Sequence, residues 1–408
     1  MTRPGPTRSG LEALYSGAVL SPFTQLRRLL ADIPPGMPAI DLTIGEPREA
    51  MPEFVVAKLL EAQSDYAKYP PIRGTNELRN AIAAWVARQY GDAVALDAER
   101  EVLPLNGSRE GLFLAALPAA GRKKVSGRPA VLMCNPYYSA YIGGALAVDA
   151  EPVFLNATAE TGHLPDLEAI AADRALLDRT VALYLCSPAN PQGAVASPAY
   201  IKGALDLARA HDFMLLFDEC YSELYSAEPP PGALQVAAAT PDRFRNLVVF
   251  NSLSKRSNLP GLRSGFCAGD RRFLESFAEL RNMVAPQLPG PTQHASAAVW
   301  SDEAHVTANR DAYRQKYDVA DRILAGRYGY RRPAGGFFLW LDVAKFGGAS
   351  DATVTLWKRG GVKVLPGAFL AQHGRDGTNP GANYVRLALV HDAATVGEAL
   401  ERFVMVLA

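Results

Sequence analysis

A lysine in the second half of the chain stands among residue types suited to covalent chemistry. Lys255 follows the apolar run 247–250 in the string Asn-Ser-Leu-Ser-Lys, and Arg263 comes shortly afterwards. A lysine brought into a desolvated pocket has a lowered pKa, and its neutral amine can attack a carbonyl carbon to form a Schiff base. The two serines of the string and Arg263 could bind a phosphate. This segment therefore predicts a lysine that holds a carbonyl compound carrying a phosphate.

Asp218 could supply the carboxylate that such a compound needs. A Schiff-base lysine beside phosphate ligands indicates pyridoxal 5'-phosphate (PLP), whose pyridine nitrogen must stay protonated for the ring to act as an electron sink. Asp218 ends the apolar run 213–217, and so it stands at the end of a predicted buried strand. The alternative role for an aspartate in this place is a helix N-cap.

The elements that must position these side chains are short apolar runs separated by helical patterns. The runs have the length and composition typical of strands buried on both faces of a parallel sheet; they lie at 130–134, 152–155, 181–186, 213–217, 247–250 and 265–268. Polar or aromatic residues follow four of them, at 135–138, 187–193, 218–221 and 252–255. Because ligands bind at the carboxyl ends of strands in α/β sheets, we expect these segments to meet at one edge. Each segment alone could be ordinary loop chemistry, but together they predict one site.

The order of the elements predicts two domains. Helical patterns at 110–120, 164–177, 200–211 and 271–283 alternate with the strands, which indicates a wound α/β domain over about 69–283. A proline-rich break at 284–292 precedes a predicted long helix, 293–326, and two further strands, 336–341 and 384–390. We therefore predict an N-terminal arm (1–45) that contributes to the small domain, a large domain (46–285) and a small C-terminal domain (286–408).

Composition limits the classes of protein that remain. The 408 residues are 49% apolar and 21% charged, which is enough for a large core, and 42 basic residues balance 42 acidic ones. A basic footprint for nucleic acid is absent. The four cysteines lie far apart and the six histidines show no metal-ligand spacing, so we expect buried thiols and no metal site. The first residues lack an apolar signal core, so we expect a cytoplasmic protein. Proline or glycine interrupts the two charge-free stretches, 129–148 and 181–201, so we expect no membrane-spanning segment.

Several motifs together resemble those of a known family. Asn-Pro-x-Gly, Asp-Glu-x-Tyr, Ser-Leu-Ser-Lys-x7-Arg and Tyr-Val-Arg, in this order, look like class I/II aminotransferases of PLP fold type I. The resemblance extends from Asp41 to Val390, and Gln192, where Thr is commoner, is a departure from it. It implies an α/β fold, with a large wound domain around a mostly parallel central sheet and a smaller α+β domain. It also implies a homodimer with active sites at the subunit interface.

The resemblance further implies roles for individual residues. Lys255 would hold PLP and move the reacting proton, Asp218 would pair with the pyridinium nitrogen, and Tyr138 would stack on the ring. Asn190 and Tyr221 would bind the 3-oxygen of the ring. The implied phosphate ligands are Gly107, Ser108, Arg109, Ser252, Arg263 and, from the neighbouring subunit, Tyr69. The implied ligands of the substrate α-carboxylate are Arg386, Gly45 and Asn190. Two alternatives stay open, since Arg386 could form a surface ion pair and Tyr69 could simply pack.

The finer resemblance concerns the substrate. Strings such as Leu-Asn-Gly-Ser-Arg-Glu and Val-Leu-Pro-Gly-Ala-Phe-Leu look like those of bacterial N-succinyl-diaminopimelate aminotransferases of lysine biosynthesis. That implies transfer of an amino group between N-succinyl-LL-2,6-diaminopimelate and 2-oxoglutarate. Basic residues such as Arg73, Arg109 or Arg256 could read the distal end of this substrate.

Three other functions remain possible at this level. The chain could be another aminotransferase of the class, for aspartate, alanine or an aromatic amino acid. It could be a PLP lyase or decarboxylase, in which the lysine and the aspartate would be the same. It could be a non-enzymatic regulator of this fold, although such regulators usually carry a basic DNA-binding module, and this chain has a net charge of 0.

Overall fold

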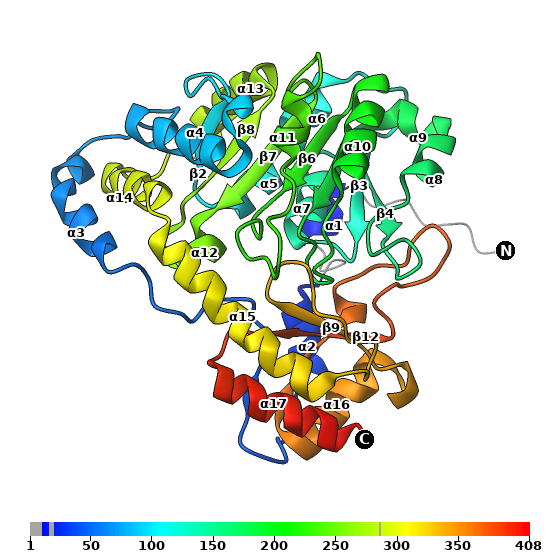
Figure 1. Cartoon of the computed structure of the whole chain (residues 1–408). Helices are drawn as coiled ribbons and strands as arrows, with labels where there is room; N and C mark the ends of the chain where they lie inside the picture. Colours follow the sequence, from blue (N-terminus) through cyan, green and yellow to red (C-terminus); the bar gives the residue numbers. More distant parts are fainter. Residues whose placement is uncertain (1–9, 16–19, 285–286) are drawn as a thin grey trace.

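The computed structural model describes residues 10–15, 20–284 and 287–408. Its main feature is a mixed sheet with strand order β2-β8-β7-β6-β5-β3-β4 (Figure 1). Strands β4, β3, β5, β6 and β7 run parallel, and β8 is antiparallel to both of its neighbours. The strands are β2 (Val102–Leu105), β3 (Ala130–Asn135), β4 (Glu151–Asn156), β5 (Thr180–Cys186), β6 (Met214–Asp218), β7 (Leu247–Ser252) and β8 (Gly265–Gly269). The predicted α/β class, with a mostly parallel central sheet, is confirmed.

Alternate side chains of these strands face two separate cores. In β6, Leu215 and Phe217 pack in one core, and Met214 and Leu216 pack in the other. This double burial is the reason that the strands read as continuous apolar runs. The first face is covered by α4 (Asn76–Tyr90), α8 (Leu167–Ala172), α10 (Pro198–Ala210), α11 (Ala233–Ala238) and α14 (Gly290–Ser301). The second face is covered by α5 (Ser108–Leu114), α6 (Ala116–Arg122), α7 (Ser139–Ala147) and α13 (Arg271–Val284).

Two of the predicted helices are each divided into two. The pattern at 110–120 forms α5 and α6, and the pattern at 164–177 forms α8 and α9 (Arg174–Arg179). The second division has a local cause: the Asp173 carboxylate accepts a hydrogen bond from the backbone N–H of Leu176 (3.0 Å) and so caps a new helix.

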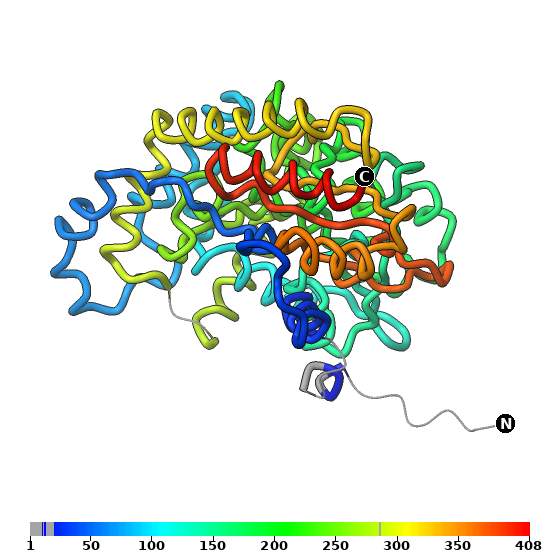
Figure 2. Tube along the Cα trace, turned by 90° about the horizontal axis from the view of Figure 1, so that it is seen from below, coloured from blue at the N-terminus to red at the C-terminus, as the bar shows by residue number. Residues whose placement is uncertain are grey.

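A second, smaller group of elements lies below the large sheet (Figure 1). Strand β12 (Tyr384–Ala388) pairs antiparallel with β9 (Phe338–Asp342) and β11 (Leu365–Pro366). Helices α15 (Ala304–Leu324), α16 (Gly348–Gly360) and α17 (Ala393–Val406) enclose their core. In the view from below, α15 (yellow) runs beside α17 (red) (Figure 2).

The N-terminal part of the chain joins this small domain. Strand β1 (Ile40–Asp41) pairs in parallel with β10 (Val362–Lys363). The remaining described helices and 3₁₀ turns are α1 (Gly10–Tyr15), α2 (Pro22–Leu29), α3 (Phe54–Glu61), η1 (Gln63–Ala67), η2 (Asp92–Val94), α12 (Leu253–Arg256), η3 (Pro260–Leu262), η4 (Ala344–Phe346) and η5 (Gly367–Phe369).

The predicted long helix 293–326 is wrong, because the chain forms α14 and α15 with a break at Asp302. Asp302 has extended backbone angles, and its carboxylate accepts from the backbone N–H of His305 (3.1 Å). Helix α14 packs in the large-domain core through Val299 and Trp300, so it belongs with the large sheet by its contacts. The predicted boundary at 285/286 itself lies outside the described residues and stays a prediction.

The cysteines and the helix lengths bear on two further expectations. All four cysteines, Cys134, Cys186, Cys220 and Cys267, are buried, as predicted. Within the described ranges, no helix is both long enough and apolar enough to cross a membrane.

Candidate active site

The strand ends that the sequence singled out meet at one edge of the sheet. Asp218 at the end of β6 is level with Cys186, the last residue of β5, and with Phe250, two residues before the end of β7. The segments that follow them carry Asn190, Tyr221 and Lys255. The parallel register thus brings polar groups far apart in sequence into one place.

Lys255 lies on the single-turn helix α12, directly after β7. Ser252 caps this helix by accepting from the backbone N–H of Ser254 (3.1 Å), which fixes where the turn begins. The Nζ atom of Lys255 donates to the backbone carbonyl of Gly45 and lies 5.4 Å from the ring centroid of Phe337. Burial lowers the pKa of Lys255 to about 8. A substantial fraction of the amine is therefore neutral near physiological pH, as a nucleophile or proton acceptor requires.

Asp218 is only 6% exposed, and its carboxylate is held from two sides. The hydroxyl of Tyr141 donates to Oδ2 (2.8 Å), and the backbone N–H of Cys220 donates to Oδ1 (3.1 Å). Burial raises the pKa of Asp218, and the hydrogen bonds from Cys220 and Tyr141 oppose that rise. A cation placed beside this carboxylate would favour its charged form. The site therefore suits a protonated ring nitrogen.

Tyr141 is a residue that the sequence analysis missed. Its ring stacks on Tyr184 (centroids 4.6 Å apart, interplanar angle 12°), which holds the hydroxyl toward Asp218. It lies in α7 three positions after Tyr138, the N-cap residue of that helix, and this spacing of the two tyrosines was a signal that could have indicated it.

Arg386, Asn190 and Tyr221 form a connected set beside Lys255. Arg386 donates through Nη1 to Asn190 Oδ1 (3.2 Å) and through Nη2 to the backbone carbonyl of Thr43 (2.7 Å). Asn190 in turn donates to the Tyr221 hydroxyl at 3.4 Å. Arg386 lies on β12 and is 5% exposed, so the surface ion pair that the sequence left open is ruled out.

The guanidinium of Arg386 is not fully satisfied by these contacts. Burial lowers the pKa of Arg386 to about 10, which still leaves the group charged at neutral pH. Its Nε is buried and has no hydrogen-bond partner among the described residues. A buried cation with a free donor favours an anionic ligand, because both the charge and the donor are costly to leave unpaired. A carboxylate fits this requirement.

The predicted phosphate ligands gather around Gly107. Arg263 donates to the carbonyls of Asn106 (3.2 Å) and Pro260 (2.9 Å), and its guanidinium lies over Gly107. A Cβ added to Gly107 would come 2.3 Å from Nη2 of Arg263, and the φ of +78° at this position is unfavourable for other residues. Ser108 follows as the first residue of α5, and its Oγ accepts from the Cys220 thiol (3.1 Å). The backbone and Arg263 thus form a narrow donor cradle.

Tyr138 and Arg109 lie against each other. Nε of Arg109 donates to the Tyr138 hydroxyl, and its guanidinium carbon is 5.4 Å from the Tyr138 ring centroid. The neighbouring Tyr137 instead accepts a hydrogen bond from the side chain of Gln372 (3.2 Å). The structure therefore places Tyr138, rather than Tyr137, with the other candidates.

Tyr69 is not brought to this site within one chain. Its side chain is 98% exposed, and it lines a surface hollow with Ile72, Met283 and Val284. No contact between Tyr69 and the residues around Lys255 is found in the described part of the chain.

Arg256 cannot bind the distal end of a substrate, which was one of the possibilities that the sequence left open. It is 1% exposed and forms ion pairs with Glu223 (3.1 Å) and Glu303 (2.8 Å). Its side chain is therefore committed to the core beside α14. Arg73 donates to the backbone carbonyl of Glu99 (3.1 Å).

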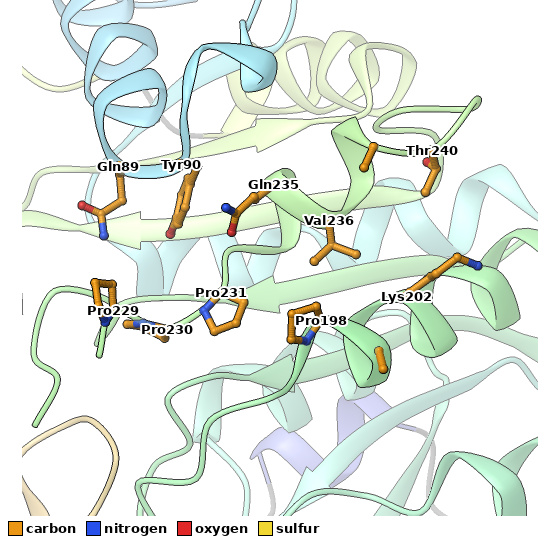
Figure 3. A pocket seen from close by; sticks show the side chains of 12 residues that line it. Gln89, Tyr90, Pro198, Lys202, Pro229, Pro230, Pro231, Gln235, Val236 and Thr240 are labelled. Carbon is orange, nitrogen blue, oxygen red and sulfur yellow. The ribbon is translucent and has the colours of Figure 1, made fainter. Parts of the chain in front are cut away.

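A surface hollow lies away from these residues. It measures about 700 Å³ and lies between α4, α10 and the segment that precedes α11 (Figure 3). Its walls include Tyr90, Lys202 and three consecutive prolines, 229–231. None of the candidate residues lines it, so this hollow is not part of the candidate site. No group of three or more metal-ligating side chains is found among the described residues.

Comparison with known proteins agrees with this geometry. The sequence profile of the family described as aminotransferase class I and II matches residues 38–403. The chain therefore belongs to this family, whose members use PLP, and it is a transaminase.

Individual relatives cover nearly the whole chain. An LL-diaminopimelate aminotransferase of Desulforudis audaxviator is 31% identical over 388 residues and 93% of each protein. A 4-dedimethylamino-4-oxo-anhydrotetracycline transaminase of Streptomyces rimosus is 32% identical over 94% of this chain and 97% of that protein. A crystal structure of an aminotransferase from Neisseria meningitidis is 38% identical, has a TM-score of 0.90 and covers 95% of this chain and 98% of its own.

The residues present fit PLP on three independent observations. Arg263 and the backbone at Gly107 form a cradle that any side chain at position 107 would fill. Asp218 is a buried carboxylate with no cation paired to it in the described structure. Lys255 is a buried amine with a lowered pKa on the same edge of the sheet. When bound, PLP supplies an electron sink for the negative charge that develops on the substrate α-carbon.

Proposed function

We propose that this transaminase takes N-succinyl-LL-2,6-diaminopimelate as amino donor and 2-oxoglutarate as acceptor, in lysine (diaminopimelate) biosynthesis. The observation that carries the proposal is a second cation near Lys255. Arg386 is joined to Asn190 and Tyr221, and Arg109 lies against Tyr138; after burial, the charges of both arginines contribute to the lowered pKa of Lys255. Two separate cations suit a substrate with two acidic ends.

Arg386 is the ligand of the α-carboxylate in this proposal, with support from Asn190 and the backbone of Gly45. Arg109 is the ligand of the distal acid. Its guanidinium bonds the Tyr138 hydroxyl and has no ion pair with a carboxylate in the described ranges. In the succinylated donor an amide replaces the distal ammonium, and the succinyl group adds a carboxylate. A positively charged side chain is therefore favoured at the distal end of the substrate.

Free LL-diaminopimelate is the second candidate donor. Relatives from several bacteria, 27–31% identical to this chain, carry the name LL-diaminopimelate aminotransferase. The two donors share the reacting end and differ only in the distal amine, so the same catalytic residues serve both.

The catalytic work falls to a few side chains. Lys255 Nζ would hold the cofactor and, once the amino group of the donor has displaced it, the freed amine would accept the proton that leaves the donor α-carbon. Asp218, oriented by Tyr141, keeps the ring nitrogen protonated. Asn190 and Tyr221 would bind the 3-oxygen of the ring, and Tyr138 would cover one face. Ser252, Arg263 and the backbone N–H groups of the segment from Gly107 to Arg109 would hold the phosphate, which leaves the Arg109 side chain free for the distal acid.

The test is a donor panel with 2-oxoglutarate. We expect kcat/KM for N-succinyl-LL-2,6-diaminopimelate to exceed that for LL-diaminopimelate, aspartate, alanine and phenylalanine. The Arg109→Met variant should lose activity with the succinylated donor and keep it with alanine, which has no distal acid. A higher kcat/KM for free LL-diaminopimelate would select the second candidate. Release of ammonia or carbon dioxide without 2-oxoglutarate would indicate a lyase or a decarboxylase instead.

We further propose that the enzyme is a homodimer in which Tyr69 reaches the partner's phosphate site. Tyr69 is almost fully exposed, and the neighbouring Met283 and Val284 are exposed apolar residues, which is unusual unless another surface covers them. Sedimentation should give a dimer. A monomeric, fully active enzyme would contradict this assembly. The cytoplasmic location stays a prediction from the sequence.

A further inference from the structure

The short helix that carries Lys255 is hydrogen-bonded by a side chain of α15, the helix that leads into the small domain. Helix α12 has only four residues, and the last carbonyls of a helix have no partner within it. Asn309 of α15 supplies one: its Nδ2 donates to the carbonyls of both Lys255 (3.1 Å) and Arg256 (3.1 Å). Asn309 is 4% exposed, so water does not replace this contact readily. Because two carbonyl oxygens face the Asn309 amide, its nitrogen rather than its oxygen must point toward α12.

The same face of α15 contacts two other parts of the site. Tyr313 and Lys316 follow Asn309 by four and seven positions, which puts all three on one side of the helix. The ring of Tyr313 stacks on Phe337 (centroids 5.2 Å apart, 20°), and Phe337 is the ring beside the Lys255 amine. Lys316 forms an ion pair of 2.6 Å with Glu49, four residues beyond Gly45.

Helix α15 also belongs to the small domain. Its C-terminal half packs in the small-domain core through Tyr317, Ala320 and Leu324. Figure 1 shows α15 running from the neighbourhood of α12 down to α17. The backbone of Lys255 is therefore tied to the element that joins the two domains.

We propose that Asn309 is a positioning residue of the transaminase, which acts through Lys255 by fixing α12 against α15. The inference rests on the role proposed above for Lys255. Without these two N–H groups, the carbonyls of Lys255 and Arg256 lose their partner on α15, while Leu253 in the core and the ion pairs of Arg256 still hold the rest of α12. The Lys255 amine then becomes more accessible to water. The substrate ligands Arg386 and Asn190 are untouched, so binding should change less than turnover.

The experiment uses the full-length protein with three substitutions. Asn309→Ala removes both donors, and Asn309→Asp keeps the shape of the side chain while its ionised form donates nothing. Tyr328→Phe is the matched control, because the Tyr328 hydroxyl also donates to one backbone carbonyl, that of Leu407 (3.0 Å), within the small domain. Thermal unfolding shows whether each variant is folded.

Two readouts separate positioning from general destabilisation. In cofactor-free protein, the pH dependence of Lys255 acylation, mapped by mass spectrometry, reports the pKa of this amine. We expect the midpoint near 8 in the unchanged protein and a shift toward the ordinary lysine value in Asn309→Ala. In the loaded enzyme, kcat should fall roughly tenfold or more, the loss expected for two buried hydrogen bonds, with little change in KM. Tyr328→Phe should leave both readouts unchanged.

The outcomes distinguish this inference from the proposed function. Borohydride trapping of the cofactor on another lysine of the unchanged protein would overturn the role of Lys255 itself. If trapping does occur on Lys255, a folded Asn309→Ala with unchanged acylation and unchanged kcat overturns the positioning role. If Asn309→Ala does not fold, Asn309→Asp decides. We then expect its turnover to improve at low pH, where the protonated carboxyl can donate one bond, and a pH profile like that of the unchanged enzyme would refute the proposal.

Discussion

Replacement of Arg386 by lysine would keep a positive charge in the site and remove the planar fork. In the structure, the two terminal nitrogens of Arg386 bind Asn190 Oδ1 and the Thr43 carbonyl, and Nε remains without a partner. A carboxylate that approaches this guanidinium can be bound by two N–H groups at once. A lysine has a single nitrogen and cannot keep the contacts to Asn190 and Thr43 while it also binds a carboxylate from two sides.

The size of the effect follows from the bonds lost. One charge-assisted hydrogen bond contributes about 1.5–3 kcal/mol, and the carbonyl of Thr43 becomes a further buried acceptor without its donor. Because a free-energy loss of about 1.4 kcal/mol corresponds to a tenfold change, we expect kcat/KM of Arg386→Lys to fall by about 10- to 100-fold or more. The loss should be similar for the amino donor and for 2-oxoglutarate, because both present the same α-carboxylate.

The assay is steady-state kinetics of both half-reactions, with Arg109→Met measured alongside. Arg109→Met should affect the long donor and spare alanine, whereas Arg386→Lys should affect every substrate. If Arg386→Lys impaired only the reaction of the succinylated donor, Arg386 would bind the distal carboxylate of that donor. The substrate would then lie in the reverse orientation. That result would refute the placement argued here.

Three other substitutions test the cofactor side of the site. Asp218→Asn should keep the fold and lower kcat by at least about 100-fold, or roughly 3 kcal/mol, because the ring nitrogen loses its counter-charge; near-normal turnover would remove Asp218 from the mechanism. Tyr141→Phe should lower kcat by a smaller factor, about tenfold, since Asp218 keeps the backbone bond from Cys220; an unchanged kcat would make Tyr141 a packing residue only. Gly107→Ala should weaken PLP binding in a spectroscopic titration, because the new Cβ would displace Arg263; a wild-type affinity would argue against the cradle.

Much of the site could be predicted from the sequence for a simple physical reason. In a parallel sheet the residues that follow each buried strand all reach the same edge, so apolar runs followed by Asp218 or by the Lys255 segment are sufficient to predict a common site. Apolar runs also predicted six of the seven strands of the large sheet, whereas β2 (Val102–Leu105) was not predicted. Helix boundaries were less predictable, since the sequence did not reveal that Asp173 caps a new helix or that the predicted helix 293–326 breaks at Asp302.

The tertiary structure alone decided the partners of the long side chains. Arg109 and Arg256 looked equivalent in the sequence, yet one lies beside Tyr138 and the other is held in the core by Glu223. Asn309, which binds the Lys255 carbonyl from a helix 54 positions away, carried no local signal at all. The sequence determines what a residue can do and on which element it lies. Its burial and its partner depend on elements distant in the chain, because they arise only when the two domains pack together.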